Sequence, residues 1–194
     1  MSRYTQIYAL CDFDLLEKSN LSIEQYIKNI SKYNIIYIQY RDKSNTIEIQ
    51  KQNLQKLKQA TSIPIIINDH LELLKYADGL HFGQEDIKKL IIDFKLKDKE
   101  LLIKFLRKKY PNKIFGLSTH NEVEILEANT LDLDYIGLGA YRDTNTKDIS
   151  QILGNKISYL AKMSKHCVGA IGGVKINDTI ENITYNVIGS DLIR

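Results

Sequence analysis

Short runs of β-branched and other apolar residues recur along the chain, separated by segments whose apolar residues return every three or four positions. Short apolar runs bounded by turn residues are typical of buried strands, and the longer spacing is typical of helices that cover them. Helical spacing is clearest in IEQYIKNISKY, IEIQKQNLQKLKQA and EVEILEA. Strands are predicted at 7–10, 35–40, 65–67, 79–82, 114–117, 135–138, 168–171 and 186–188.

This alternation of strands and helices indicates parallel strands joined by crossover helices. Eight units predict an α/β fold of the (β/α)8 or TIM-barrel type, because an open doubly wound sheet more usually has about five or six strands. We expect one compact domain over residues 1–194, since no linker, repeat or low-complexity tract divides the chain. The eighth strand is followed only by GSDLIR, so we expect a shortened C-terminal end whose last helix is vestigial or missing.

One segment, residues 87–113, is long for a single crossover and is expected to form two helices or an enlarged insertion. Its lysines could be interpreted as a nucleic-acid-binding patch. Lysines interleaved with leucine and isoleucine at helical spacing are more typical of a solvated outer face, and we favour that interpretation.

Composition narrows the possible partners. Hydrophobic residues make up 43% of the chain, and 27 basic residues are nearly balanced by 24 acidic ones, giving a net charge of +3. This small charge gives no reason to expect a nucleic-acid partner. No apolar stretch is long enough for a signal peptide or membrane span, so we expect a soluble cytoplasmic protein that acts on small molecules. Cys11 and Cys167 lack paired spacing and are expected to be core residues. A homo-oligomer is left open.

Candidate chemistry begins in YIQYRDK, at the end of the second predicted strand. Gln39, Arg41 and Lys43 occupy alternate positions, so one face of the strand would direct all three toward the barrel mouth. Burying unpaired cations is costly, and an anionic partner is therefore needed. Protein carboxylates or a ligand phosphate could supply it.

Carboxylates follow the next two strands. Asn68 and Asp69 end the third strand in IIINDH, and Asp86 follows the fourth in GQED. Asp69 and Asp86 could hold Mg²⁺, with waters and phosphate oxygens as the remaining ligands. Alternatively, Asp86 is the N-cap of the following helix, and Asp69 pairs with Arg41.

Polar residues also follow the fifth and sixth strands. Ser118 and His120 lie in GLSTHN, where they can donate hydrogen bonds and His120 could move a proton. Ser118 or Asn121 could instead cap the next helix. The loop after the sixth strand is long enough to close over a ligand, or it is a polar surface loop. Its candidate residues are Thr144, Thr146 and Lys147.

Glycines follow the last two strands. Gly172 and Gly173, in AIGGV, would let backbone N–H groups approach an anion closely. Gly189 and Ser190 begin the last turn beside them. Such a glycine site recurs in barrels of unrelated chemistry, so any phosphate-binding barrel enzyme remains an alternative.

Taken in order, YIQYRDK, IIINDH, ADGLHFGQED, GLSTH, DYIGLGAYRDTNTK and AIGGV resemble the thiamine phosphate synthase family, which includes a thiazole tautomerase branch. The resemblance covers nearly the whole chain. It implies a (β/α)8-barrel transferase of thiamine biosynthesis. Such an enzyme joins hydroxymethylpyrimidine diphosphate to a thiazole phosphate and releases pyrophosphate in a Mg²⁺-dependent step.

The resemblance also implies roles for the candidate residues. Asp69 and Asp86 match the magnesium positions. The resemblance implies contacts to the pyrimidine diphosphate and its leaving group for Gln39, Arg41, Lys43, Asn68, Ser118 and Lys147. Among these, it implies catalytic contacts for Arg41, Lys43, Ser118 and Lys147. Contacts to the thiazole phosphate are implied for Thr144, Thr146, Gly172, Gly173, Gly189 and Ser190.

Departure of pyrophosphate needs neutralising charge and positioning rather than a nucleophile with its base, which agrees with the residues found. The chain departs from the family in GAYRDTNTK, where Arg142 and Asp143 stand before the first threonine, and in its abbreviated C-terminal segment. A thiazole tautomerase using His120 and a non-catalytic phosphate-binding paralogue are the alternatives. A magnesium requirement would favour the synthase.

Overall fold

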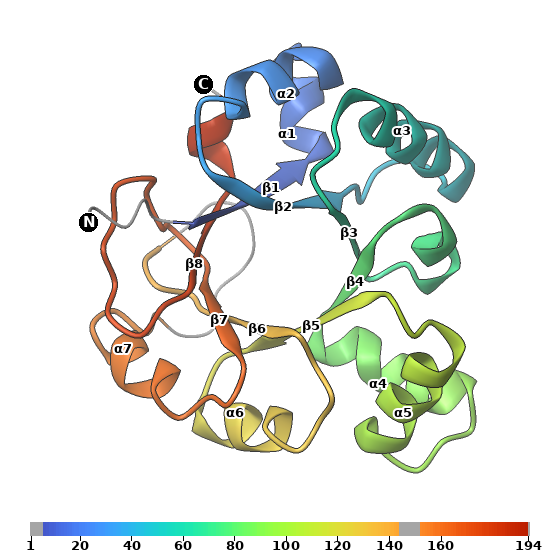
Figure 1. The fold of residues 1–194 in the computed structure, drawn as a ribbon, viewed down its shortest axis with the longest axis vertical. Coiled ribbons are helices and arrows are strands. Elements are labelled where there is room, and N and C mark those ends of the chain that lie inside the picture. Colours follow the sequence, from blue (N-terminus) through green and yellow to red (C-terminus); the bar gives the residue numbers. More distant parts are fainter. Residues whose placement is uncertain (1–5, 144–151, 194) are drawn as a thin grey trace.

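The computed structural model describes residues 6–143 and 152–193. Eight parallel strands form a closed barrel in chain order, with the last strand paired to the first (Figure 1). The predicted TIM barrel is therefore confirmed. The strands are β1 (Gln6–Asp12), β2 (Ile35–Arg41), β3 (Ile65–Asn68), β4 (Gly79–Phe82), β5 (Ile114–Thr119), β6 (Tyr135–Leu138), β7 (Cys167–Ala170) and β8 (Tyr185–Ile188).

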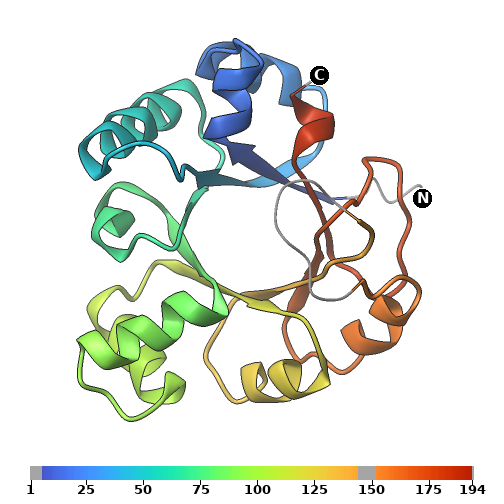
Figure 2. The same ribbon diagram turned by 180° about the vertical axis from the view of Figure 1, so that it is seen from behind.

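Helices surround the barrel, as both face views show (Figures 1 and 2). They are α1 (Phe13–Lys18), α2 (Ile23–Ile30), α3 (Ile47–Ala60), η1 (Leu71–Tyr76), α4 (Gln84–Asp93), α5 (Lys99–Lys109), α6 (Glu122–Ala128), α7 (Lys156–Ala161) and η2 (Ser190–Leu192). The long segment after β4 thus forms two helices, one of the two expected outcomes. Among the described residues that follow β8, Ser190–Leu192 form the 3₁₀ turn η2.

Polar residues fix where several helices begin. The hydroxyl of Ser22 accepts a hydrogen bond from the backbone N–H of Gln25, and the side chain of Gln25 accepts one from the N–H of Ser22. This capping box satisfies N–H groups that have no partner inside α2. At α6 the side-chain oxygen of Asn121 accepts a hydrogen bond from the N–H of Glu124.

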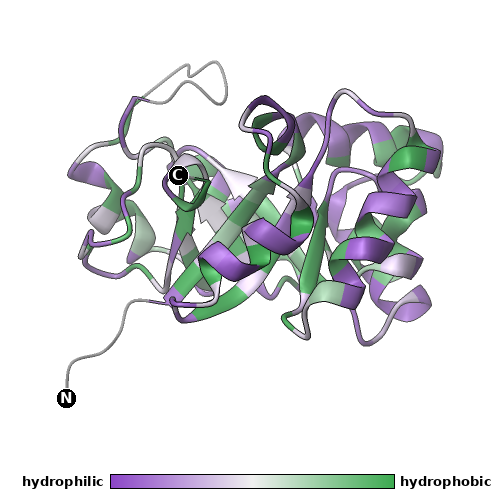
Figure 3. Ribbon diagram, turned by 90° about the horizontal axis from the view of Figure 1, so that it is seen from above, coloured by the Kyte–Doolittle hydropathy of each residue, from purple (hydrophilic) through white to green (hydrophobic). Residues whose placement is uncertain are grey.

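The hydrophobic core has two parts. A large outer cluster packs the outward faces of the strands under the apolar sides of the helices, and the hydropathy colouring shows polar helix surfaces turned outward (Figure 3). A smaller cluster fills the inside of the barrel. Cys11 belongs to the outer core, as expected, whereas the prediction for Cys167 is wrong: Cys167 begins β7 and is exposed.

Tyrosine rings occupy much of the barrel interior. Tyr8 contacts Tyr37 and Tyr135 edge to face, with ring centroids 5.6 and 5.5 Å apart, and Tyr185 packs against the same group. Gly116 makes room for them, because a Cβ atom there would lie 2.1 Å from Cζ of Tyr135. The rings pack inside the barrel below the carboxyl ends of the strands, the end at which TIM barrels carry their active sites.

In the part of the chain that the structure describes, no helix is long and apolar enough to cross a membrane.

Candidate active site

The carboxyl end of β2 carries two of the predicted side chains. Gln39 follows Tyr37 on the inward face and is buried. Its Nε2 donates a hydrogen bond of 2.7 Å to Oδ1 of Asn68, at the end of β3. The two predicted amide residues are therefore in direct contact, and each limits how the other can turn.

Arg41 ends β2 and forms a partly buried ion pair with Asp12, at the end of β1. The side chain of Asp12 is 3% exposed, and its other oxygen accepts a hydrogen bond of 3.2 Å from the N–H of Leu15, which caps α1. The alternative that Arg41 pairs with Asp69 is therefore wrong. A protein carboxylate already satisfies part of the requirement for an anion near Arg41.

Lys43 lies apart from these residues. It comes two positions after the end of β2 and is exposed, so it does not share the inward face of the strand with Gln39 and Arg41. This corrects the expectation of three aligned side chains. Within the described residues, the Lys43 ammonium group has no ion-pair partner.

Asp69 and Asp86 face each other where β3 and β4 end. Asp69 has a left-handed backbone conformation, with φ of 63°, and its Oδ1 accepts a hydrogen bond of 3.2 Å from the N–H of Gly83. Its Oδ2 accepts one from the side chain of Asn68. Asp86 lies in the first turn of α4, whose N-cap is Gly83, so the alternative that Asp86 is the N-cap is wrong.

The pKa of Asp69 shows the effect of this arrangement. Burial, and then the neighbouring Asp86 carboxylate, raises the pKa of Asp69 to about 6. Two facing carboxylates with few neutralising groups favour a hard divalent cation, which takes oxygen ligands. No cluster of three or more metal-ligating residues is found among the described residues, so water or ligand oxygens would have to complete the coordination of any ion.

Ser118 lies near the end of β5 and is held at two points. Its carbonyl oxygen accepts a hydrogen bond of 2.6 Å from Nε2 of Gln84, which Lys99 in turn contacts at 2.8 Å. Its Oγ lies 2.9 Å from Nε2 of His81, a buried residue of β4. The alternative that Ser118 caps α6 is wrong, because Asn121 does so.

The glycine pair after β7 forms a tight turn. Gly172 and Gly173 have φ of 84° and 64°, and a Cβ atom on Gly172 would lie 2.6 Å from Cβ of Ala140. Within the described residues, neither glycine N–H donates a hydrogen bond. The turn of Gly189 and Ser190 follows β8, the strand next to β7.

Thr144, Thr146 and Lys147 lie outside the residues that the structure describes. The loop that leads to them is anchored by Arg142. Its guanidinium group contacts Asp178 at 2.5 and 3.0 Å and donates a hydrogen bond of 3.0 Å to the carbonyl oxygen of Gly173. A residue in which the chain departs from the family thus joins the loops after β6 and β7.

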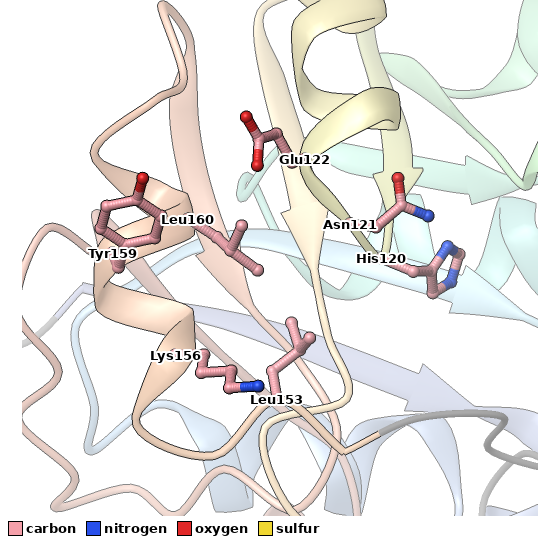
Figure 4. A pocket seen from close by; sticks show the side chains of 7 residues that line it. All are labelled: His120, Asn121, Glu122, Leu153, Lys156, Tyr159 and Leu160. Carbon is pink, nitrogen blue, oxygen red and sulfur yellow. The ribbon is translucent and has the colours of Figure 1, made fainter.

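His120 lies at the outer side of the rim. Its Nδ1 is 2.9 Å from a carboxylate oxygen of Glu124, one turn along α6. A pocket of about 390 Å³ lies between the start of α6 and α7. Figure 4 shows the side chains that line it. Its walls are His120, Asn121, Glu122, Leu153, Lys156, Tyr159 and Leu160. This pocket includes none of the residues predicted to bind substrate.

Two residues in contact with the predicted set were missed by the sequence analysis, Asp12 and His81. Asp12 follows the apolar run YALC, so its place at a strand end was a usable signal. His81 alternates with Gly79 along β4, and this period of two indicates an inward-facing position.

Fold and site together define a (β/α)8-barrel protein with amide, carboxylate and hydroxyl groups gathered at the carboxyl ends of its strands. The family model for thiamine monophosphate synthase matches residues 7–193. The chain therefore belongs to this family.

Individual members of this family are similar to the chain in sequence. The chain is 34% identical over 188 residues to the thiamine-phosphate synthase of Lawsonia intracellularis, covering 92% of this chain and 79% of the relative. It is 32% identical over 189 residues to that of Staphylococcus epidermidis, covering 92% and 81%. Among solved structures, thiamine phosphate pyrophosphorylase from Pyrococcus furiosus superposes with a TM-score of 0.73 at 18% identity, covering 98% and 88%. At that identity the superposition concerns the fold alone.

Proposed function

We propose that this protein is a thiamine-phosphate synthase. It would couple hydroxymethylpyrimidine diphosphate to thiazole phosphate and release pyrophosphate. Membership of the family and the named relatives at 34% and 32% identity support the reaction. The observation that carries the proposal is the pair of carboxylates Asp69 and Asp86 beside the hydrogen-bonded amides of Gln39 and Asn68.

Two groups of residues would bind the pyrimidine diphosphate. Gln39 and Asn68 present amide groups whose mutual hydrogen bond fixes their orientation. Arg41, Lys43, Ser118 and Lys147 would neutralise or hydrogen-bond the leaving diphosphate. Asp12 holds Arg41 in one orientation, whereas Lys43 is exposed and reaches a ligand by moving its flexible side chain.

Asp69 and Asp86 would hold Mg²⁺. Their oxygens are the ligand type that this ion prefers, and burial together with the neighbouring Asp86 carboxylate raises the pKa of Asp69. When bound, the ion would supply positive charge that stabilises the departing pyrophosphate. Asn68 and the N–H of Gly83 orient the Asp69 carboxylate toward this role.

The thiazole phosphate would bind where the loops after β6, β7 and β8 meet. The N–H groups of Gly172 and Gly173 donate no hydrogen bond in the described structure, which leaves them able to bind phosphate oxygens. Gly189 and Ser190, on the neighbouring strand end, and Thr144 and Thr146 would add contacts.

The direct test is to incubate the purified protein with both phosphorylated substrates and Mg²⁺ and to detect thiamine phosphate by mass spectrometry. We expect product that disappears when the metal is chelated. Asp69→Ala should lower coupling by ~100-fold or more, as expected for loss of a transition-state charge contact.

A matched control is Glu85→Ala, which removes a carboxylate from the first turn of α4 whose side chain is 86% exposed. Its coupling rate should be unchanged. Full activity in both Asp69→Ala and Lys147→Ala would contradict the proposed site. Metal-independent isomerisation of the thiazole phosphate alone, lost in His120→Ala, would instead identify a tautomerase.

A further inference from the structure

A hydrogen-bonded chain runs through the barrel interior and ends at Ser118. The hydroxyl groups of Tyr8 and Tyr135 are 2.7 Å apart, and the Tyr135 hydroxyl is 3.0 Å from Nδ1 of His81. Nε2 of His81 is 2.9 Å from Oγ of Ser118. Tyr8 and Tyr135 are 1% exposed and His81 is 7% exposed, whereas Ser118 is half-buried at the rim. The chain therefore joins the deep interior to the proposed substrate site.

The direction of these hydrogen bonds follows from the position of Tyr8. Within the described residues, its hydroxyl group has a hydrogen-bond partner only in Tyr135. If Tyr135 donated to Tyr8, the buried hydroxyl hydrogen of Tyr8 would have no acceptor, which is costly in the protein interior. Tyr8 is therefore the donor, and burial raises the pKa of both tyrosines, which keeps both hydroxyl groups protonated.

The donors and acceptors in the remaining hydrogen bonds of this series follow from that of Tyr8. The oxygen of Tyr135 accepts from Tyr8, so its single hydrogen is available for Nδ1 of His81. A neutral imidazole that accepts at Nδ1 carries its proton on Nε2, and this N–H points at Oγ of Ser118. Since Ser118 accepts this bond, its own hydroxyl hydrogen is free to be donated elsewhere.

We propose that Tyr8 and Tyr135 are positioning residues: they hold the proton of His81 on Nε2, so that Ser118 accepts from His81 and donates its hydroxyl hydrogen to a substrate oxygen. The identity of this substrate oxygen rests on the proposed function, in which it belongs to the pyrimidine diphosphate. The bond from Gln84 to the Ser118 carbonyl oxygen fixes the serine backbone, and the tyrosine chain fixes its hydroxyl group.

The tautomer can be measured without turnover, by long-range ¹H–¹⁵N NMR of histidine-labelled protein. His166 is an internal reference, because its Nε2 faces the carbonyl oxygen of Ala128 at 2.9 Å and must donate. We expect His81 to give the same Nε2–H pattern. A proton on Nδ1 of His81, or a doubly protonated ring, would overturn the proposal whether or not the enzyme is active.

Tyr135→Phe keeps the aromatic ring and removes only the hydroxyl group. It should shift the ¹⁵N resonance of His81 Nδ1 and lower kcat by about tenfold with little change in KM, the effect of one hydrogen bond. Tyr37→Phe is the matched control, because Tyr37 stacks on Tyr135 with centroids 6.1 Å apart but takes no part in the chain. Tyr37→Phe should change neither the ¹⁵N resonance of His81 Nδ1 nor kcat.

A double-mutant cycle separates positioning from packing. In a Ser118→Ala background, Tyr135→Phe should cause no further loss of kcat, because the residue through which it acts is gone. An equal loss in both backgrounds would overturn the proposal. Should Tyr135→Phe not fold, His81→Gln can supply an amide N–H near the position of Nε2, and it should retain more activity than His81→Ala.

These readouts keep the two proposals apart. A parent protein that makes no thiamine phosphate contradicts the proposed function, while the NMR pattern of His81 still decides the tautomer. An active parent whose His81 carries its proton on Nδ1 contradicts the positioning role and leaves the synthase in place.

Discussion

Among single residues, Asp69 combines a proposed role in binding metal with a cost to the folded protein. Its pKa is raised to about 6, chiefly by burial and also by the Asp86 carboxylate. A carboxyl group whose pKa is higher in the folded than in the unfolded state binds its proton more tightly in the folded state. The folded protein is therefore destabilised by this group as the pH rises from about 4 to about 6.

Asp69→Asn should consequently stabilise the metal-free protein. At about pH 7.5 we expect an increase of about 1–3 kcal/mol in the free energy of unfolding, because the amide carries no charge to bury. The gain should shrink below about pH 6 and vanish below about pH 4. Urea denaturation in the presence of a chelator, at several pH values, measures it.

Glu85→Gln is the control for this effect, since it neutralises an exposed carboxylate in the same turn of α4. Its unfolding free energy should stay within about 0.5 kcal/mol of the parent at every pH. A loss of stability in Asp69→Asn at neutral pH would show that hydrogen bonds of the carboxylate outweigh its burial.

The sequence allowed the position of some side chains at the barrel rim to be predicted, but not their contacts. Gln39 and Asn68 meet because both lie at strand ends, which a barrel brings to one rim. The place of Lys43 could not be predicted, because the strand boundary two residues earlier depends on pairing with β1, in which Arg41 is opposite Asp12. The partner of Arg41 was also out of reach, since several carboxylates lie at the same rim and only the packed structure selects Asp12.

At the scale of elements, strands β5 and β6 pack closely because a glycine on β5 lies opposite a tyrosine on β6. Gly116 and Tyr135 are paired in register, and the Tyr135 ring occupies the space that a side chain at Gly116 would need. The small residue on one strand is thus a condition for the large residue on the next. Close packing in barrel interiors leaves little freedom to relieve such a clash.

Gly116→Ala should therefore destabilise the protein by about 3 kcal/mol or more, because its Cβ atom would lie 2.1 Å from the Tyr135 ring. Gly137→Ala is a graded comparison on the neighbouring strand, with its nearest contact 3.2 Å away at Cε1 of His81. Thermal unfolding of both variants should rank Gly116→Ala as much the less stable. Equal melting temperatures would mean that the tyrosine can move aside.

Most elements were predictable because their patterns are local. Apolar runs located all eight strands, and helical spacing located α3 at residues 47–60 and α6 at residues 122–128. The segment 87–113 was ambiguous because the break between α4 and α5 lies in residues 94–98, which contain neither proline nor glycine. The local signal in this segment is Asp98, whose side chain caps α5 by accepting a hydrogen bond of 2.9 Å from the N–H of Leu101.

At the scale of the whole molecule, barrel closure through β1 and β8 makes the first and last strands neighbours. No strand of the described barrel has a free edge, and the outer core runs continuously beneath the helices. We therefore expect the protein to unfold as one cooperative unit, which is the remaining test of the single-domain prediction.

Two optical signals can test this cooperativity. The chain has 12 tyrosines and no tryptophan, so near-ultraviolet circular dichroism reports largely on tyrosines, several of which pack inside the barrel. Far-ultraviolet circular dichroism reports on the helices. The two unfolding curves should have the same midpoint, and Leu192→Ala, which truncates a buried residue of η2, should move both equally. Separate midpoints would indicate a part that unfolds independently.

The tyrosines inside the barrel also bear on the side from which a ligand can reach the strand ends. Packed aromatic rings occupy the barrel interior at the level of Tyr37, Tyr135 and Tyr185. A ligand that contacts Gln39 or Ser118 would therefore approach these side chains from the face of the barrel where the strands end.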